Sequence, residues 1–192
     1  MQRTDIDPLC AAVQRDTRRW LERAVIGLNL CPFAKAVHTR GQIHYAVSRA
    51  GTPTLLLDDL MRELHDLTSF DPSVRETTLL MAPDCLAEFL QFNDFLKTAD
   101  RVLEKLGLEG VIQLASFHPG YQFADAVDGD IANCTNRAPY PTLHLLRESS
   151  IDRAVASFPE AEAIFERNLE TLKNLGPEGW DRLGIGRTAP HG

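Results

Sequence analysis

Hydrophobic positions recur along much of this chain at the 3.6-residue spacing of an amphipathic helix. The pattern predicts a first helix over residues 8–30, capped by Asp7 just before a proline. It predicts a second helix that Thr52 caps, and a third that begins near Asp84 and stops at Gly107. Helices therefore account for most of the first half of the chain.

Short apolar runs between these helices predict strands, at residues 43–47, 77–81, 111–117 and 142–147. A last helix is expected over residues 151–175, interrupted at Pro159. Helices that lie between successive strands indicate an α/β fold. We expect one mixed sheet of about four strands, a βαβαβ core plus one further strand, flanked by an N-terminal and a C-terminal helix.

The length of 192 residues favours a single domain, 1–192, with loose termini at 1–6 and 176–192. No apolar run approaches the roughly 18 residues that span a bilayer, and the first residues lack a signal-peptide core. We therefore expect a cytoplasmic protein without a membrane partner. The net charge of -7 makes nucleic acid a poor candidate partner, and the sequence does not predict the oligomeric state.

The cofactor question stays open at this level. The four cysteines are scattered without a close pair, so their spacing predicts neither a disulfide framework nor a zinc ribbon. No nucleotide-binding, zinc-protease or serine-hydrolase motif is present. A transition metal is possible only if folding gathers distant ligands, for example His118 with His44 or His144.

Most of the reactive side chains follow the third predicted strand, in a loop over residues 116–141. Such loops on rigid elements often carry binding and catalytic groups. His118, held between a strand end and a Pro-Gly turn, suits acid–base chemistry, and Asp125 could orient its ring. The alternative is a structural histidine that fixes its own loop through a backbone hydrogen bond.

The second half of the loop is suited to recognition of an anion. Arg137 offers a planar fork for a carboxylate or phosphate, and the neighbouring candidates for substrate binding are Asn133, Asn136 and Tyr121. The alternative is that Arg137 bridges the loop to an acidic residue such as Asp125 and serves only its structure.

Cys31 and Lys35 lie in a turn after the first helix and form a second candidate segment. A nearby Lys35 or Arg137 would lower the pKa of the Cys31 thiol and activate it as a nucleophile or metal ligand. The negative end of the first helix would oppose this, and free cysteines are often simply buried.

The motifs at residues 30–35 (Leu-Cys-Pro-Phe-Ala-Lys), 116–123 and 136–147 resemble those of an uncharacterised bacterial family known as domain of unknown function 1415. The resemblance covers nearly the whole chain. It implies a single-domain protein and supplies no activity, cofactor or catalytic residue.

Two hypotheses follow from the side chains. The first is an enzyme acting on a small anionic metabolite, with His118, Cys31 and Asp125 as catalytic residues and an anion held by Arg137 and Lys35. The second is a non-catalytic domain that binds a small ligand or a metal. A single site of either kind requires the Cys31 turn to meet the loop after the third strand.

Overall fold

The computed structural model describes residues 7–127, 129–157 and 163–188. The expected loose ends at 1–6 and 189–192, and the helix interruption expected at Pro159, lie outside these residues. None of the described helices is long and apolar enough to cross a bilayer.

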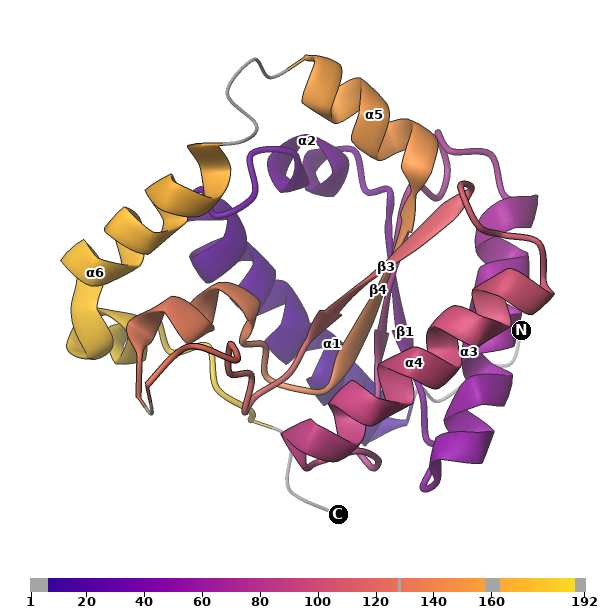
Figure 1. Cartoon of the computed structure of the whole chain (residues 1–192), viewed down its shortest axis with the longest axis horizontal. Helices are drawn as coiled ribbons and strands as arrows, with labels where there is room; N and C mark the ends of the chain where they lie inside the picture. The colour runs from indigo at the N-terminus through magenta and orange to yellow at the C-terminus, as the bar shows by residue number, and fades with distance from the viewer. Residues whose placement is uncertain (1–6, 128, 158–162, 189–192) are drawn as a thin grey trace.

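The centre of the fold is one four-stranded mixed sheet, formed by β1 (Ile43–Val47), β2 (Thr77–Met81), β3 (Ile112–Phe117) and β4 (Thr142–Arg147). The strand order is β1-β2-β4-β3 (Figure 1), with β1 parallel to β2 and β4 antiparallel to both of its neighbours. The predicted α/β fold with a mixed sheet is thus confirmed. The loop of interest joins the edge strand β3 to the inner strand β4.

One face of the sheet packs against α3 (Pro53–Ser69) and α4 (Phe89–Lys105). Four leucines of α3 at helical spacing are almost completely buried there, namely Leu56, Leu60, Leu64 and Leu67. They join Leu143 and Leu145 of β4 in one apolar cluster. We call this side the α3/α4 face. The burial of these apolar side chains stabilises the packing of the two helices on the sheet.

The opposite side, which we call the α1 face, packs against α1 (Pro8–Trp20) and a following π-helix, η1 (Leu21–Ile26). Trp20 meets Phe117 of β3 edge to face, with ring centroids 5.1 Å apart. The sequence predicted one continuous helix to residue 30. The widened turns of η1 differ from this prediction; such insertions are frequent at functional sites.

Four shorter or later helices follow within the described residues: α2 (Ala34–Thr39), the 3₁₀ helix η2 (Ile131–Asn136), α5 (Glu148–Ala156) and α6 (Ile164–Arg182). Leu172 of α6, Leu30 and Cys134 share a small apolar cluster. This cluster brings α6, the turn after η1 and the loop after β3 together.

Local capping signals were correct at three of the four positions named. Asp7 accepts a hydrogen bond from the Leu9 backbone N–H, Thr52 accepts one from Leu55, and Gly107 follows α4 with φ +66°. Asp84 was wrong, because α4 begins only at Phe89. The Asp84 carboxylate instead pairs with Arg49, at 2.7 Å.

The segment from residue 176 also differs from the predicted loose terminus. After a kink at Gly176, where φ is +66°, the chain stays helical to Arg182. Beyond it, Ile185 is buried and the Thr188 N–H donates to the fully buried carboxylate of Asp16, at 2.7 Å. Polar contacts therefore fasten this end of the described chain to α1.

Candidate functional site

The loop between β3 and β4 is held by hydrogen bonds to itself. The His118 N–H donates to the Asn136 carbonyl (3.1 Å), the Phe123 N–H to Asn133 Oδ1 (2.9 Å), and Arg137 Nε to the Tyr121 carbonyl (3.1 Å). Several of the predicted site residues thus maintain the shape of the loop.

His118 occupies the most constrained position. It is 1% exposed, Nε2 donates to the Leu86 carbonyl at 3.0 Å, and Nδ1 accepts from the Gly120 N–H at 3.0 Å. Burial lowers the pKa of this histidine, although the bond to Leu86 opposes the change. The ring is therefore neutral with both nitrogens occupied, which fits the structural alternative better than proton transfer.

Arg137 also contributes to the loop. Besides Tyr121, its side chain hydrogen-bonds the buried thiol of Cys134, whose pKa is raised by burial. The Tyr121 ring packs against Phe89 in a tilted arrangement, with centroids 5.1 Å apart, and Asn136 Oδ1 accepts from the Thr135 hydroxyl. Arg137 makes no ion pair with Asp125 within the described residues, so the bridge considered from the sequence runs to a carbonyl instead.

Asn133 and Asp125 lie in contrasting environments. Asp125 is exposed to solvent. Asn133 is completely buried, and its Nδ2 donor has no hydrogen-bond partner among the described residues. An amide flip would not relieve this, because the Phe123 N–H requires the oxygen where it stands.

Cys31 lies in the turn between η1 and α2. Burial raises the pKa of its thiol, and hydrogen bonds from the backbone N–H groups of Phe33 and Ala34 only partly oppose this rise. The thiol is therefore protonated at neutral pH and weakly nucleophilic. Lys35 is exposed.

The Cys31 turn and the β3–β4 loop do meet. Leu30 packs with Cys134, and Ala34 packs against the cluster that also includes Phe117. The meeting is made by apolar side chains. In the part of the chain that the structure describes, no hydrogen bond or ion pair joins Cys31, His118 and Asp125.

A partly enclosed cavity of about 130 Å³ lies beside this meeting point. One wall is the turn after η1 and the other is the first two turns of α6; the lining residues are Leu28, Asn29, Pro32, Ile164, Arg167, Asn168 and Thr171. We call it the α6 cavity. Asn168 Nδ2 donates to the Leu30 carbonyl at 2.8 Å, which fixes one wall to the other.

Sequence reasoning missed the residues that α6 contributes to this cavity. Arg167, Asn168 and Thr171 have the spacing of one helical face, so they could have been grouped. Nothing local indicates that this face meets Asn29, which lies more than 130 positions earlier in the sequence. Asn29 adopts a left-handed conformation, φ +54°, that few residues other than glycine take.

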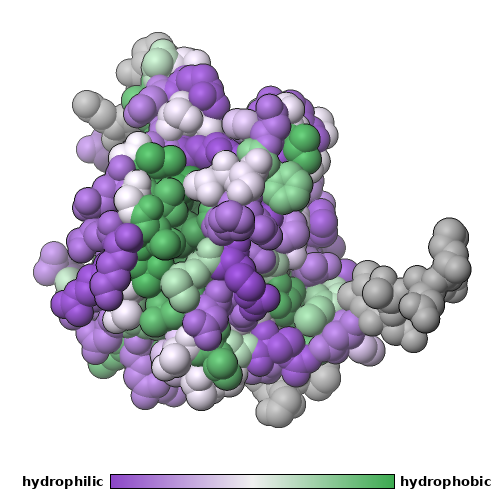
Figure 2. Space-filling model, turned by 90° about the vertical axis from the view of Figure 1, so that its right-hand side faces the viewer, coloured by the Kyte–Doolittle hydropathy of each residue, from purple (hydrophilic) through white to green (hydrophobic). Residues whose placement is uncertain are grey.

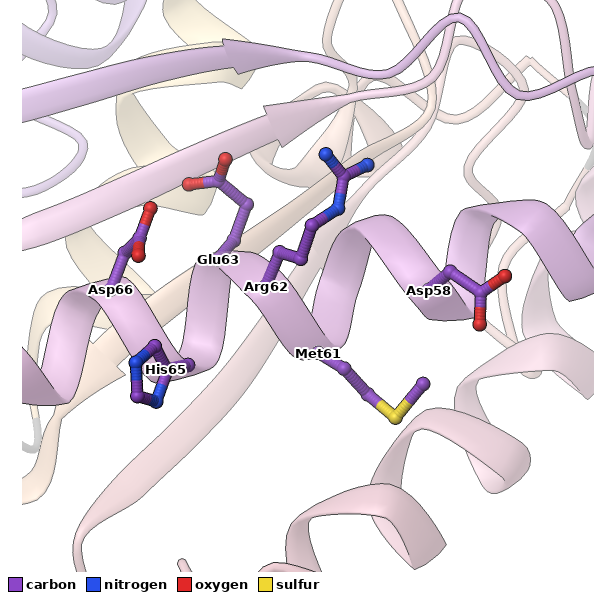
Figure 3. A pocket seen from close by; sticks show the side chains of 6 residues that line it. All are labelled: Asp58, Met61, Arg62, Glu63, His65 and Asp66. Carbon is purple, nitrogen blue, oxygen red and sulfur yellow. The ribbon is translucent and has the colours of Figure 1, made fainter.

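A larger and more open depression runs along the outer surface of α3, with a volume of about 490 Å³. Its lining residues all come from that one helix, as Figure 3 shows: Asp58, Met61, Arg62, Glu63, His65 and Asp66. Glu63 pairs with the buried Arg75, and Arg62 with Asp59. The depression is open and formed by a single helix, so it is a weaker candidate than the partly enclosed α6 cavity, which lies between two segments.

The surrounding surface carries exposed apolar side chains. Leu55 and Met61 of α3 and Leu90 of α4 are exposed, and Figure 2 shows a strip of hydrophobic surface between hydrophilic side chains on this side of the molecule. Nothing in the structure indicates what would cover it.

The described residues contain no group of three or more His, Cys, Asp or Glu side chains arranged to hold a metal ion. His44 lies 3.7 Å from Glu63 on the α3/α4 face, whereas His118 contacts Leu86. The pairing of these two histidines at one metal, considered as one possibility from the sequence, is not formed among the described residues.

Comparison with known proteins identifies the family and nothing further. A family model described as a protein of unknown function (DUF1415) matches residues 12–182, so the chain belongs to that family. This confirms the resemblance carried by the motifs. No curated protein and no solved structure matches the chain.

Proposed function

We propose that this DUF1415 member is a non-catalytic domain that binds a small anion, such as a carboxylate or phosphate, in the α6 cavity. The composition of the lining carries the proposal. Arg167, two side-chain amides and the Thr171 hydroxyl face one enclosed space, and no carboxylate lines it among the described residues. A guanidinium with neutral hydrogen-bonding groups is a favourable environment for an anion.

The position of α6 also favours a negatively charged ligand. Ile164 is the first residue of α6, so the cavity lies at the positive end of the helix dipole. This position adds to the attraction exerted by Arg167.

The volume limits the ligand to a small molecule. A cavity of about 130 Å³ has room for one small anion. Phosphate and short-chain carboxylates fit this limit, whereas a nucleotide does not.

The states of the predicted catalytic residues favour binding without turnover. His118 has both ring nitrogens bonded to the backbone, and burial raises the pKa of Cys31. Neither group is prepared for acid–base or nucleophilic chemistry. The catalytic roles of His118, Cys31 and Asp125, and the anion contacts of Lys35 and Arg137, remain predictions.

Calorimetric titration with phosphate, acetate and uncharged glycerol tests the proposal. We expect one anion to bind with 1:1 stoichiometry and glycerol not to bind. Arg167→Gln should weaken binding about 10-fold or more, because a charge-assisted hydrogen bond is lost. Thr171→Val, which keeps the side-chain shape, should weaken it by a smaller factor.

The matched control is Arg101→Gln, which removes an exposed arginine from α4. It changes net charge by the same amount as Arg167→Gln and should leave affinity unchanged. Equal losses in the two variants would indicate a general charge effect and contradict the proposal. Absence of binding by either anion at millimolar concentration would contradict it as well.

A further inference from the structure

His144 lies near the middle of β4, on the α1 face of the sheet. Its register partners are Leu79 of β2 and Ala115 of β3, and direct partners in neighbouring strands point to the same side. Phe117 is on this side as well, with its ring centroid 6.2 Å from that of His144. The imidazole is thus framed by apolar side chains.

Hydrogen-bond accounting fixes the tautomer of this histidine. The Thr77 hydroxyl donates its only proton to the Leu145 carbonyl, at 2.6 Å. Its oxygen lies 2.8 Å from His144 Nε2 and can only accept there, so Nε2 carries the proton. Because burial lowers the pKa of the ring to about 4, only one nitrogen is protonated at neutral pH, so His144 Nδ1 is an unprotonated acceptor. No described residue donates to it.

We propose that His144 Nδ1 is the acceptor in a second binding site on the α1 face, for a neutral ligand that has an aromatic body and one O–H or N–H donor. The surrounding side chains favour such a body: Ala115, Phe117, His144 and Leu146 are all only partly buried, so solvent reaches this part of the sheet. On the α3/α4 face of the same strand, Leu143 and Leu145 are sealed.

The charge state sets the chemical class of this ligand. Burial lowers the pKa of His144 to about 4, so the ring stays neutral at physiological pH. A neutral acceptor offers no charge to attract an anion, and a carboxylate has no proton to donate to it. The site is therefore distinct from the α6 cavity in what it recognises and does not depend on it.

Phenol and toluene form a matched pair of probes, because they share the ring and differ in the donor. We expect the ratio of phenol to toluene affinity to fall about 3- to 10-fold in His144→Leu, the value of one neutral hydrogen bond. His144→Asn keeps an acceptor oxygen near the position of Nδ1 and should restore most of the ratio. Circular dichroism checks that both variants are folded.

The wild-type protein provides a second measurement that needs no variant. Nitrogen-15 NMR of the imidazole should show the His144 Nδ1 resonance moving when phenol is added, while Nε2, bonded to Thr77, stays in place. Failure of phenol to bind the wild type would overturn the site. Binding of phenol with an unmoved Nδ1 resonance, or an unchanged affinity ratio in His144→Leu, would overturn the role of Nδ1.

Discussion

The two faces of the sheet are held to the rest of the molecule by different forces. On the α3/α4 face, leucines from one helix and one strand exclude solvent almost completely. On the α1 face, solvent reaches part of the sheet, and hydrogen bonds to the buried Asp16 fasten α1 to Tyr140 and to Thr188. One face resembles an ordinary hydrophobic core, and the other combines polar fastening with accessible side chains.

Buried polar groups on the two faces also differ in how fully they are hydrogen-bonded. Near the α3/α4 face, the terminal nitrogen of Arg147 donates to three carbonyls, including Leu67 at 2.5 Å and Phe70 at 2.8 Å. One arginine Nε on each side, that of Arg19 on α1 and that of Arg147, has no hydrogen-bond partner within the described residues. The buried Tyr45 hydroxyl, in the apolar cluster of the α1 face, is also unpartnered there. Among these groups, the Tyr45 hydroxyl is the one that distinguishes the α1 face.

Two adjacent leucines of β4 test this contrast, because the same substitution can be made at neighbouring positions of one strand that face opposite sides of the sheet. Leu145 is fully buried on the α3/α4 face, and Leu146 is partly exposed on the α1 face. We expect Leu145→Ala to lower the free energy of unfolding by about 3–4 kcal/mol, because it removes buried hydrocarbon and leaves a cavity. Leu146→Ala should cost about 1 kcal/mol. Equal losses in urea unfolding would show that both faces are sealed.

The pH dependence of stability should come partly from His144. The pKa of His144 is about 4 in the folded state, compared with 6.5 for a histidine in the unfolded chain. Since the unfolded chain then binds the extra proton, the neutral ring contributes stability above pH 6.5 that is lost as pH falls toward 4. The contribution is up to about 3 kcal/mol.

The measurement is the difference between the stability curves of the wild type and His144→Gln from pH 7 to pH 4. This difference removes the effects of His118 and His44, whose pKa values burial also lowers. A difference that stays constant with pH would mean that His144 is not shielded, and the α1 face would then be more open than we infer.

The strands and helix caps could be predicted because their signals are local. Thr52 and Asp7 each bond a backbone N–H within three residues, and β4 occupies the range predicted from its apolar run. Asp84 failed because the chain turns at Leu86, with φ +56°, before the helix begins, and because Arg49 takes its carboxylate. Neither fact can be seen in the neighbouring sequence.

Less of the candidate site could be predicted from the sequence. A single site required the loop after β3 and the Cys31 turn to meet, and apolar side chains of the two segments do pack together. The state of His118 depends on the carbonyl of Leu86, which is 32 positions away. The α6 cavity depends on Asn168 reaching Leu30, at a separation of 138 positions. Such long-range pairings leave no periodic trace in sequence.

Asp16→Asn tests whether polar fastening holds the α1 face together. The wild-type carboxylate accepts from the Tyr140 hydroxyl at 2.8 Å, from Thr188 and from Arg19 at 2.7 Å, and it is fully buried. The amide can accept at one atom only, so we expect a loss of about 2 kcal/mol. Proteolysis between residues 183 and 188 should become faster, because that segment loses its anchor. Unchanged cleavage would assign the fastening to the buried Ile185 instead.

Arg167→Gln should have the smallest effect on stability and thereby separate binding from folding. Arg167 is exposed on α6, and surface substitutions of this kind usually change the free energy of unfolding by less than about 0.5 kcal/mol. If the cavity binds an anion, Arg167→Gln should weaken that binding and leave the ligand-free melting temperature unchanged. Added phosphate should raise the melting temperature more in the wild type than in the variant. A large loss of stability without ligand would instead make Arg167 part of the fastening of α6, and the cavity would be a by-product of packing.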